Sequence, residues 1–278
     1  FPQKSPLIHL GFLALSLAFI PLAFETDIHG EWPPFLTVVS CLWTHIGIPY
    51  VCLSATAPLL QAWVEGTGHQ FPYRLYAWSN AGSLLGLLAY PLILEPFFTL
   101  TQQQMLWSMG YAIFAMGMGY VAWMCRKSGM SHDEATQTSQ PRMVWLFASG
   151  LGVILLMSIT EAIADDLTVS PLLWVLPLAC YLMTFIVAFG RPNWVPARPW
   201  AYALLVAVPG MVWLIYQGWR LPWMLQVGGW CTALTIGCMV CHGTLIRSRP
   251  MEGQLTRFYA YVAGGGAIGG MAVSILAP

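Results

Sequence analysis

Nine apolar stretches, each about the length of a membrane-spanning helix, constrain the fold of this chain more than any other feature. They run over Pro6–Phe24, Phe35–Trp63, Tyr73–Phe97, Gln104–Cys125, Met143–Glu161, Pro171–Phe189, Pro196–Gln217, Pro222–Ile246 and Thr256–Pro278. An α-helix needs about 20 mostly apolar residues to cross ~30 Å of hydrocarbon. The pattern predicts an all-α, polytopic integral membrane protein with about nine transmembrane helices in a transporter-like bundle.

The composition excludes a soluble globule. Hydrophobic residues make up 58% of the 278 residues and charged residues only 8%, whereas about 25% of a soluble domain is charged. Eleven basic residues balance eleven acidic ones, so the chain has no net positive field that would attract nucleic acid. We therefore expect the lipid bilayer as a partner and no nucleic acid.

The basic residues fall almost entirely on one side of the expected membrane. Of the eleven, only Arg220 lies at the opposite face. The other ten are Lys4, Arg74, Arg126, Lys127, Arg142, Arg191, Arg198, Arg247, Arg249 and Arg257. Because basic loops stay on the cytoplasmic side, this sorting predicts a cytoplasmic N-terminus.

One connection divides the expected spans into two groups. Residues 127–141 are rich in Ser, Thr, Gln and charged side chains, which is typical of a solvated linker. We expect a first helical half of four spans over 1–126, a cytoplasmic linker over 127–141 and a second half of five spans over 142–278.

Short sequence segments in nearly every span carry a family resemblance. They are Pro58-Leu59-Leu60-Gln61, Trp63, Pro72-Tyr73, Leu75-Tyr76, Ser79-Asn80, Gly82-Ser83, Tyr90-Pro91, Glu95-Pro96, Gln103, Trp107, Gly110-Tyr111, Pro171, Leu173 to Leu178, Tyr181-Leu182, Phe185, Phe189, His242-Gly243, Leu245, Arg249-Pro250, Leu255-Thr256, Phe258-Tyr259 and Gly269-Gly270. In this order they resemble the membrane region of the bacterial fused major-facilitator/spermidine-synthase-like family.

The resemblance implies a transporter-like region in the bacterial cytoplasmic (inner) membrane. It also implies a C-terminal, aminopropyltransferase-like domain, which these 278 residues do not include. The chain departs from the family pattern at Thr244, where the family usually has Glu, and at Glu161 and Asp165, where amides are usual.

Three acidic residues gather at the outer end of the fifth span. Glu161 and Asp165 are four residues apart, so one helical turn can present both carboxylates, and Asp166 follows. Carboxylates at a membrane boundary suit proton exchange or the capture of a cation such as a polyamine. We hypothesise an outward-facing cation or proton site; the alternative is a solvated acidic loop.

Other polar residues lie within the spans. His45 is in the middle of the second span near Gly47 and Pro49, and Asn80 and Ser83 form a polar stripe on the third. Each has two interpretations, as part of a substrate or ion path or as a hydrogen-bonded packing residue between helices.

Glycines mark one face of the ninth span. Gly265 pairs with Gly269 and Gly266 with Gly270 at the spacing that lets a second helix approach closely. The same run matches a dinucleotide-binding fingerprint, but no strand precedes it. We expect helix packing there, to which another membrane subunit could contribute.

Cys238, Cys241 and His242 match the C-x-x-C-H signature of covalent haem attachment. The motif lies at the expected cytoplasmic end of the eighth span, whereas such haem is attached on the outer side, so haem is disfavoured. We expect no cofactor and no metal site. No arrangement suited to nucleophilic catalysis is present, so we do not expect an enzyme.

Two functional hypotheses remain. The first is a transporter-like protein for a small solute, with a polyamine-like cation as the suggested case. The alternative is a non-catalytic structural or anchor subunit of a larger membrane protein complex.

Overall fold

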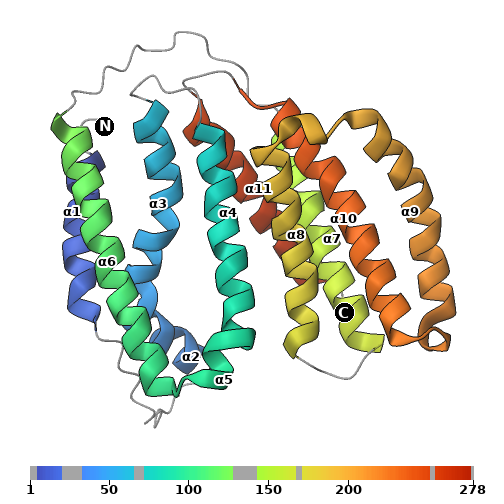
Figure 1. The fold of residues 1–278 in the computed structure, drawn as a ribbon, viewed down its shortest axis with the longest axis horizontal. Helices are drawn as coiled ribbons and strands as arrows, with labels where there is room; N and C mark the ends of the chain where they lie inside the picture. The colour runs from blue at the N-terminus through green and yellow to red at the C-terminus, as the bar shows by residue number, and fades with distance from the viewer. Residues whose placement is uncertain are drawn as a thin grey trace. The chain divides into compact units, whose positions relative to one another are not determined.

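The computed structural model describes residues 5–20, 33–65, 72–127, 143–166, 171–250 and 254–276. Within these ranges every regular element is helical (Figure 1). Eight helices of the described residues are long and apolar enough to cross a membrane. The predicted all-α, polytopic membrane fold is therefore confirmed.

The long helices coincide with the second to ninth expected spans. They cover Pro34–Gln61, Arg74–Phe97, Leu100–Cys125, Met143–Asp165, Leu173–Gly190, Ala197–Gln217, Trp223–Arg247 and Arg257–Leu276. The first expected span is a shorter apolar helix over Pro6–Phe19, and residues 21–24 of that prediction lie outside the described part of the chain.

The chain divides into two compact units. The first comprises residues 1–69 and 92–133. Its elements are α1 (Ser5–Ser16), η2 (Leu17–Phe19), α2 (Pro34–Leu42), η3 (Trp43–Gly47), α3 (Ile48–Glu65), α5 (Glu95–Phe97) and α6 (Leu100–Lys127). Its core is formed by Leu13 of α1, Cys52 and Trp63 of α3, and Tyr111 and Met118 of α6.

Within the described ranges, two helices contain a wider, π-helical turn. One is η3, which joins α2 to α3 and ends two residues before Pro49, and the other is η4 (Tyr90–Leu94), which contains Pro91. Proline has no backbone N–H and its ring crowds the preceding turn, so each π turn lies where regular hydrogen bonding is interrupted. Such turns are frequent at functional sites.

The second unit comprises residues 70–91 and 134–278. Its elements are α4 (Pro72–Ala89), α7 (Met143–Asp166), α8 (Pro171–Gly190), η5 (Pro192–Trp194), α9 (Ala197–Gln217), η6 (Gly218–Arg220), α10 (Trp223–Arg247) and α11 (Leu255–Leu276). Figure 1 shows α10 between α7 and α9; α10 packs on α7, α8 and α9, and α4 packs on α8. The central position of α10 explains why half of its apolar window is buried, against 11% for α9.

Aromatic side chains fill much of the second unit. Trp145, Phe185, Phe189 and Phe258 lie in one cluster with Tyr259. Rings pack edge to face within it, as Trp145 does against Phe258 with 5.3 Å between centroids. The expected linker lies almost wholly outside the described residues, so the boundaries proposed for the two halves stay a prediction.

Candidate functional site

The acidic pair lies on the exposed face of the last turns of α7. Glu161 and Asp165 are both exposed, whereas Ile159 and Ile163, on the opposite face of the same turns, are almost fully buried. The two carboxylates therefore share one helix face, one turn apart. The side chain of Asp166 lies outside the described residues.

The polar stripe of α4 is hydrogen-bonded within its own helix. Asn80 Nδ2 donates to Tyr76 O at 2.8 Å, and Ser83 Oγ donates to Ser79 O at 3.2 Å. Asn80 is half-buried and Ser83 is exposed. These bonds join neither residue to the carboxylates of α7.

His45 lies in the π turn of the first unit. Its Nδ1 is 2.8 Å from Cys41 O and 3.1 Å from Thr44 Oγ1. Because a carbonyl oxygen can only accept a hydrogen bond, Nδ1 carries a proton and donates it to Cys41 O. This bond fixes the imidazole against the irregular turn.

The glycines of α11 lie against α7 of the same chain. A Cβ added to Gly265 would overlap Leu146 O, and one added to Gly269 would overlap Gly150 O. The contact is looser at the other two glycines. A Cβ added to Gly266 would lie 3.5 Å from a methyl carbon of Val153, and one added to Gly270 would lie 3.9 Å from the other methyl carbon. Ser149 Oγ donates to Val262 O at 2.6 Å beside this contact. The stripe thus forms a close helix contact inside the second unit.

The three residues of the haem-like motif lie inside the packed core. Cys238, Cys241 and His242 are all buried, and Cys238 Sγ lies 3.9 Å from Gly152 O. Attachment to a porphyrin would require both thiols and the imidazole to leave that core. Among the described residues, no group of three or more His, Cys, Asp and Glu side chains could hold a metal ion.

His242 forms a polar contact that its place in the motif did not reveal. Thr184 Oγ1 donates to Tyr181 O at 2.6 Å, which uses its only proton. The same oxygen is 2.9 Å from His242 Nδ1, so it accepts a hydrogen bond from Nδ1–H. His242 Nε2 is buried and has no hydrogen-bond partner among the described residues.

Two more buried polar residues lie in the first unit. Gln61 of α3 is 1% exposed, and neither atom of its amide has a hydrogen-bond partner among the described residues. Nε2 of His9 on α1 is also buried and has no hydrogen-bond partner among the described residues. The His9 ring lies edge to face against Trp63, with 6.0 Å between centroids. The hydropathy of these spans gave no sign that the two side chains would point inward.

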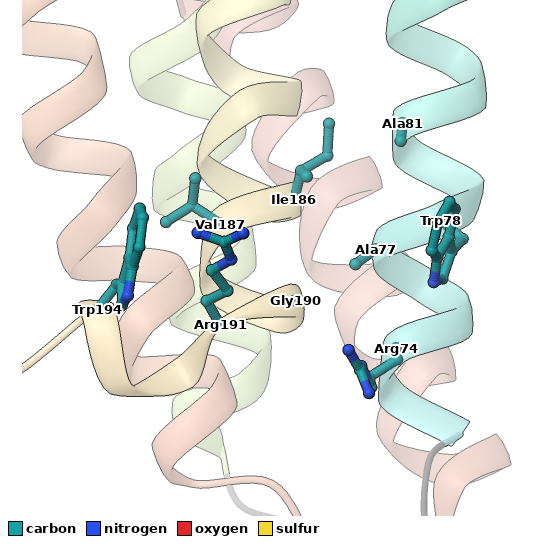
Figure 2. A pocket seen from close by; sticks show the side chains of 9 residues that line it. All are labelled: Arg74, Ala77, Trp78, Ala81, Ile186, Val187, Gly190, Arg191 and Trp194. Atoms are coloured by element: carbon teal, nitrogen blue, oxygen red, sulfur yellow. The ribbon is translucent and has the colours of Figure 1, made fainter.

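An open groove of about 390 Å³ lies between α4 and the end of α8 (Figure 2). Arg74 and Arg191 line it together with two indoles, Trp78 and Trp194. The guanidinium carbon of Arg191 is 4.4 Å from the centroid of the Trp194 ring. The sequence predicts both arginines on the cytoplasmic side of the membrane, but nothing in their spacing indicates that they share a groove.

Comparison with known proteins adds no assignment: no protein-family model, no curated protein and no solved structure matches this chain.

Proposed function

We propose that this chain is the membrane region of a transporter-like protein for a small solute. The observation that carries the proposal is the buried amide of Gln61 in the first unit, which has no hydrogen-bond partner among the described residues. Leaving a buried polar group unpaired costs about 1–3 kcal/mol, and polar side chains inside a membrane bundle are typically part of a solute or ion path. A water molecule or a solute hydrogen-bonded to this amide would remove that cost.

His9 and the π turn support the same function. His9 adds a second buried polar atom without a partner among the described residues of the first unit, and His45 lies in an irregular turn of the helix that leads to Gln61. Irregular helices and inward polar side chains are the means by which transporters build binding sites in lipid.

The acids at the end of α7 support a cation as the solute. Glu161 and Asp165 present two carboxylates on one exposed helix face, and a polyamine carries ammonium groups that such a pair would attract. The resemblance to the fused major-facilitator/spermidine-synthase-like family supports a transporter-like membrane region, whereas the suggestion of a cation rests on the acids alone. On this proposal the chain resides in the bacterial inner membrane with a cytoplasmic N-terminus.

Uptake by proteoliposomes tests the proposal. Purified chain reconstituted into vesicles should accumulate radiolabelled putrescine or spermidine above protein-free vesicles, and Gln61→Leu should abolish the difference. Glu161→Gln combined with Asp165→Asn should weaken uptake of the cations.

The matched control Ser40→Ala removes an exposed hydroxyl that donates to Thr37 O of its own helix and should transport normally. Wild-type vesicles that take up no more polyamine than empty ones would refute the cationic solute.

One observation favours the alternative, an anchor subunit. The groove between α9 and α10 has a volume of about 440 Å³ and is lined by the small residues Gly210, Gly228 and Gly229, which permit close approach of another helix. Leu205, Val206 and Tyr216 of α9 are strongly exposed. Gentle purification in which the chain always carries a second membrane protein at fixed stoichiometry would favour this function over transport.

A further inference from the structure

The segment that joins α8 to α9, residues 191–198, is fixed against the end of α10. Arg247 Nη1 donates to Val195 O at 2.9 Å, and Val195 is 1% exposed. A Cβ added to Gly243 of α10 would lie 2.6 Å from Val195 Cγ1, so the backbone of α10 comes close to this side chain. On the α9 side, Trp200 Nε1 donates to Trp194 O at 3.4 Å. These contacts hold the backbone of the α8–α9 segment in place.

Three arginines belong to the α8–α9 segment or bond to it. Arg191 is its first residue, Arg198 is its last and lies in the first turn of α9, and Arg247 reaches it from α10. All three are exposed. The guanidinium carbon of Arg191 lies 4.4 Å from the centroid of the Trp194 ring, and Figure 2 shows these two side chains beside each other at the end of α8. The segment therefore gathers three positive charges.

No carboxylate along the surrounding helices offsets these charges. The sequence contains no Asp or Glu from Pro171 to Pro250, a stretch that includes all of α8, α9 and α10. Arg247 donates to two neutral acceptors, Val195 O and Thr244 Oγ1, and a guanidinium has five N–H donors. A cation in the first turn of a helix opposes the helix dipole, so Arg198 does not serve the stability of α9. The three charges are thus suited to an anion from outside these helices.

The three arginines share one boundary of the membrane. Arg191 directly follows the last residue of one apolar span, Arg198 is the second residue of the next, and Arg247 is the last residue of the third. The indole of Trp194 beside them is 61% exposed, and indoles prefer the level of the lipid headgroups. The anions concentrated at this level are the phosphates of the bilayer.

We propose that the α8–α9 segment binds the phosphate of an anionic phospholipid. Arg191 and Arg198 donate to the phosphate oxygens, since hydrogen bonds between guanidinium and phosphate are charge-assisted and strong. Arg247 adds positive charge while it fixes the segment through Val195 O. Because the backbone is held before the lipid arrives, little further ordering opposes binding.

Lipid retention by the purified full-length chain tests this proposal. Native mass spectrometry would compare phosphatidylglycerol with phosphatidylcholine of matched acyl chains, and glycerol 3-phosphate would probe the phosphate without a lipid. Wild-type chain should retain phosphatidylglycerol about tenfold better than phosphatidylcholine. Arg191→Gln and Arg198→Gln should each weaken retention of phosphatidylglycerol by roughly fivefold. Arg198→Lys keeps the charge and should weaken it less.

Arg220→Gln is the charge-matched control because Arg220 lies in η6, at the opposite end of α9. It should leave retention of phosphatidylglycerol unchanged. Equal retention of the two lipids by wild-type chain would overturn the proposal without any variant. A loss for Arg220→Gln as large as that for Arg198→Gln would also overturn it, because retention would then follow net charge. Glycerol 3-phosphate that binds as tightly as phosphatidylglycerol would replace the lipid by a free phosphate as the ligand.

Discussion

His242 lies face to face with Phe185, with 3.6 Å between the ring centroids and 28° between the planes. The imidazole is fully buried, and Tyr181 meets it edge-on at 5.0 Å. These two rings pack against the imidazole, and its one polar contact within the described part of the chain is the hydrogen bond from Nδ1–H to Thr184 Oγ1. The contact joins α8 to α10 at the centre of the second unit.

Removing the hydroxyl of Thr184 should destabilise the second unit. Thr184→Val keeps the shape of the side chain but leaves Nδ1–H of His242 buried without an acceptor, which costs about 1–3 kcal/mol. Thr232→Val is the matched control because Thr232 is exposed and its hydroxyl donates to Gly228 O of its own helix. Heat- or SDS-induced unfolding in detergent should give a lower midpoint for Thr184→Val alone. Equal midpoints for both variants would show that the buried bond has no net effect.

The close contact between α7 and α11 predicts a strong effect of one methyl group. Gly265→Ala places a Cβ against the backbone oxygen of Leu146, which cannot move like a flexible side chain. Overpacking of this kind typically costs about 1–3 kcal/mol. At Gly264 an added Cβ meets nothing within 4 Å, so Gly264→Ala should leave stability unchanged or raise it slightly. If Gly264→Ala proves as harmful in SDS titration as Gly265→Ala, the close backbone contact of Gly265 with α7 is contradicted.

In the first unit, a hydroxyl pair links α1 to α6. Ser16 Oγ donates to Leu13 O at 2.7 Å and therefore accepts from Tyr111 OH, also at 2.7 Å. Tyr111→Phe should cost roughly 0.6 kcal/mol, the average for such bonds in membrane bundles. Tyr120→Phe, at an exposed position of the same helix, provides the comparison. Thermal unfolding of both variants in detergent measures the difference, and a Tyr111→Phe midpoint at or above that of Tyr120→Phe would contradict the prediction.

Hydropathy predicted the helices well because crossing a membrane imposes length and apolarity on each segment separately. Helix partners depend instead on small residues and matching shapes, and for that reason the packing of α4 on α8 was not anticipated. The glycines of α11 indicated a close contact, but their spacing could not identify α7 as the partner. Likewise, the inward direction of Gln61 and the shared groove of Arg74 and Arg191 depend on how helices rotate against one another, which hydropathy does not record.

Ser149 distinguishes hydrogen bonding from steric fit in the contact of α7 with α11. Its hydroxyl donates to Val262 O of α11 at 2.6 Å and is 2% exposed. Ser149→Ala removes this bond, but the carbonyl oxygen of Val262 keeps the hydrogen bond that it accepts within its own helix. The loss in unfolding free energy should therefore be about 0.6 kcal/mol, which is smaller than the loss expected for Gly265→Ala. Ser274→Ala removes an exposed hydroxyl that bonds to Gly270 O of its own helix and should have no effect. Unfolding free energies from SDS titration of the three variants should therefore rank Gly265→Ala, Ser149→Ala and Ser274→Ala in order of decreasing damage. The reverse order of the first two would mean that the polar bond, rather than the close backbone approach, holds these helices together.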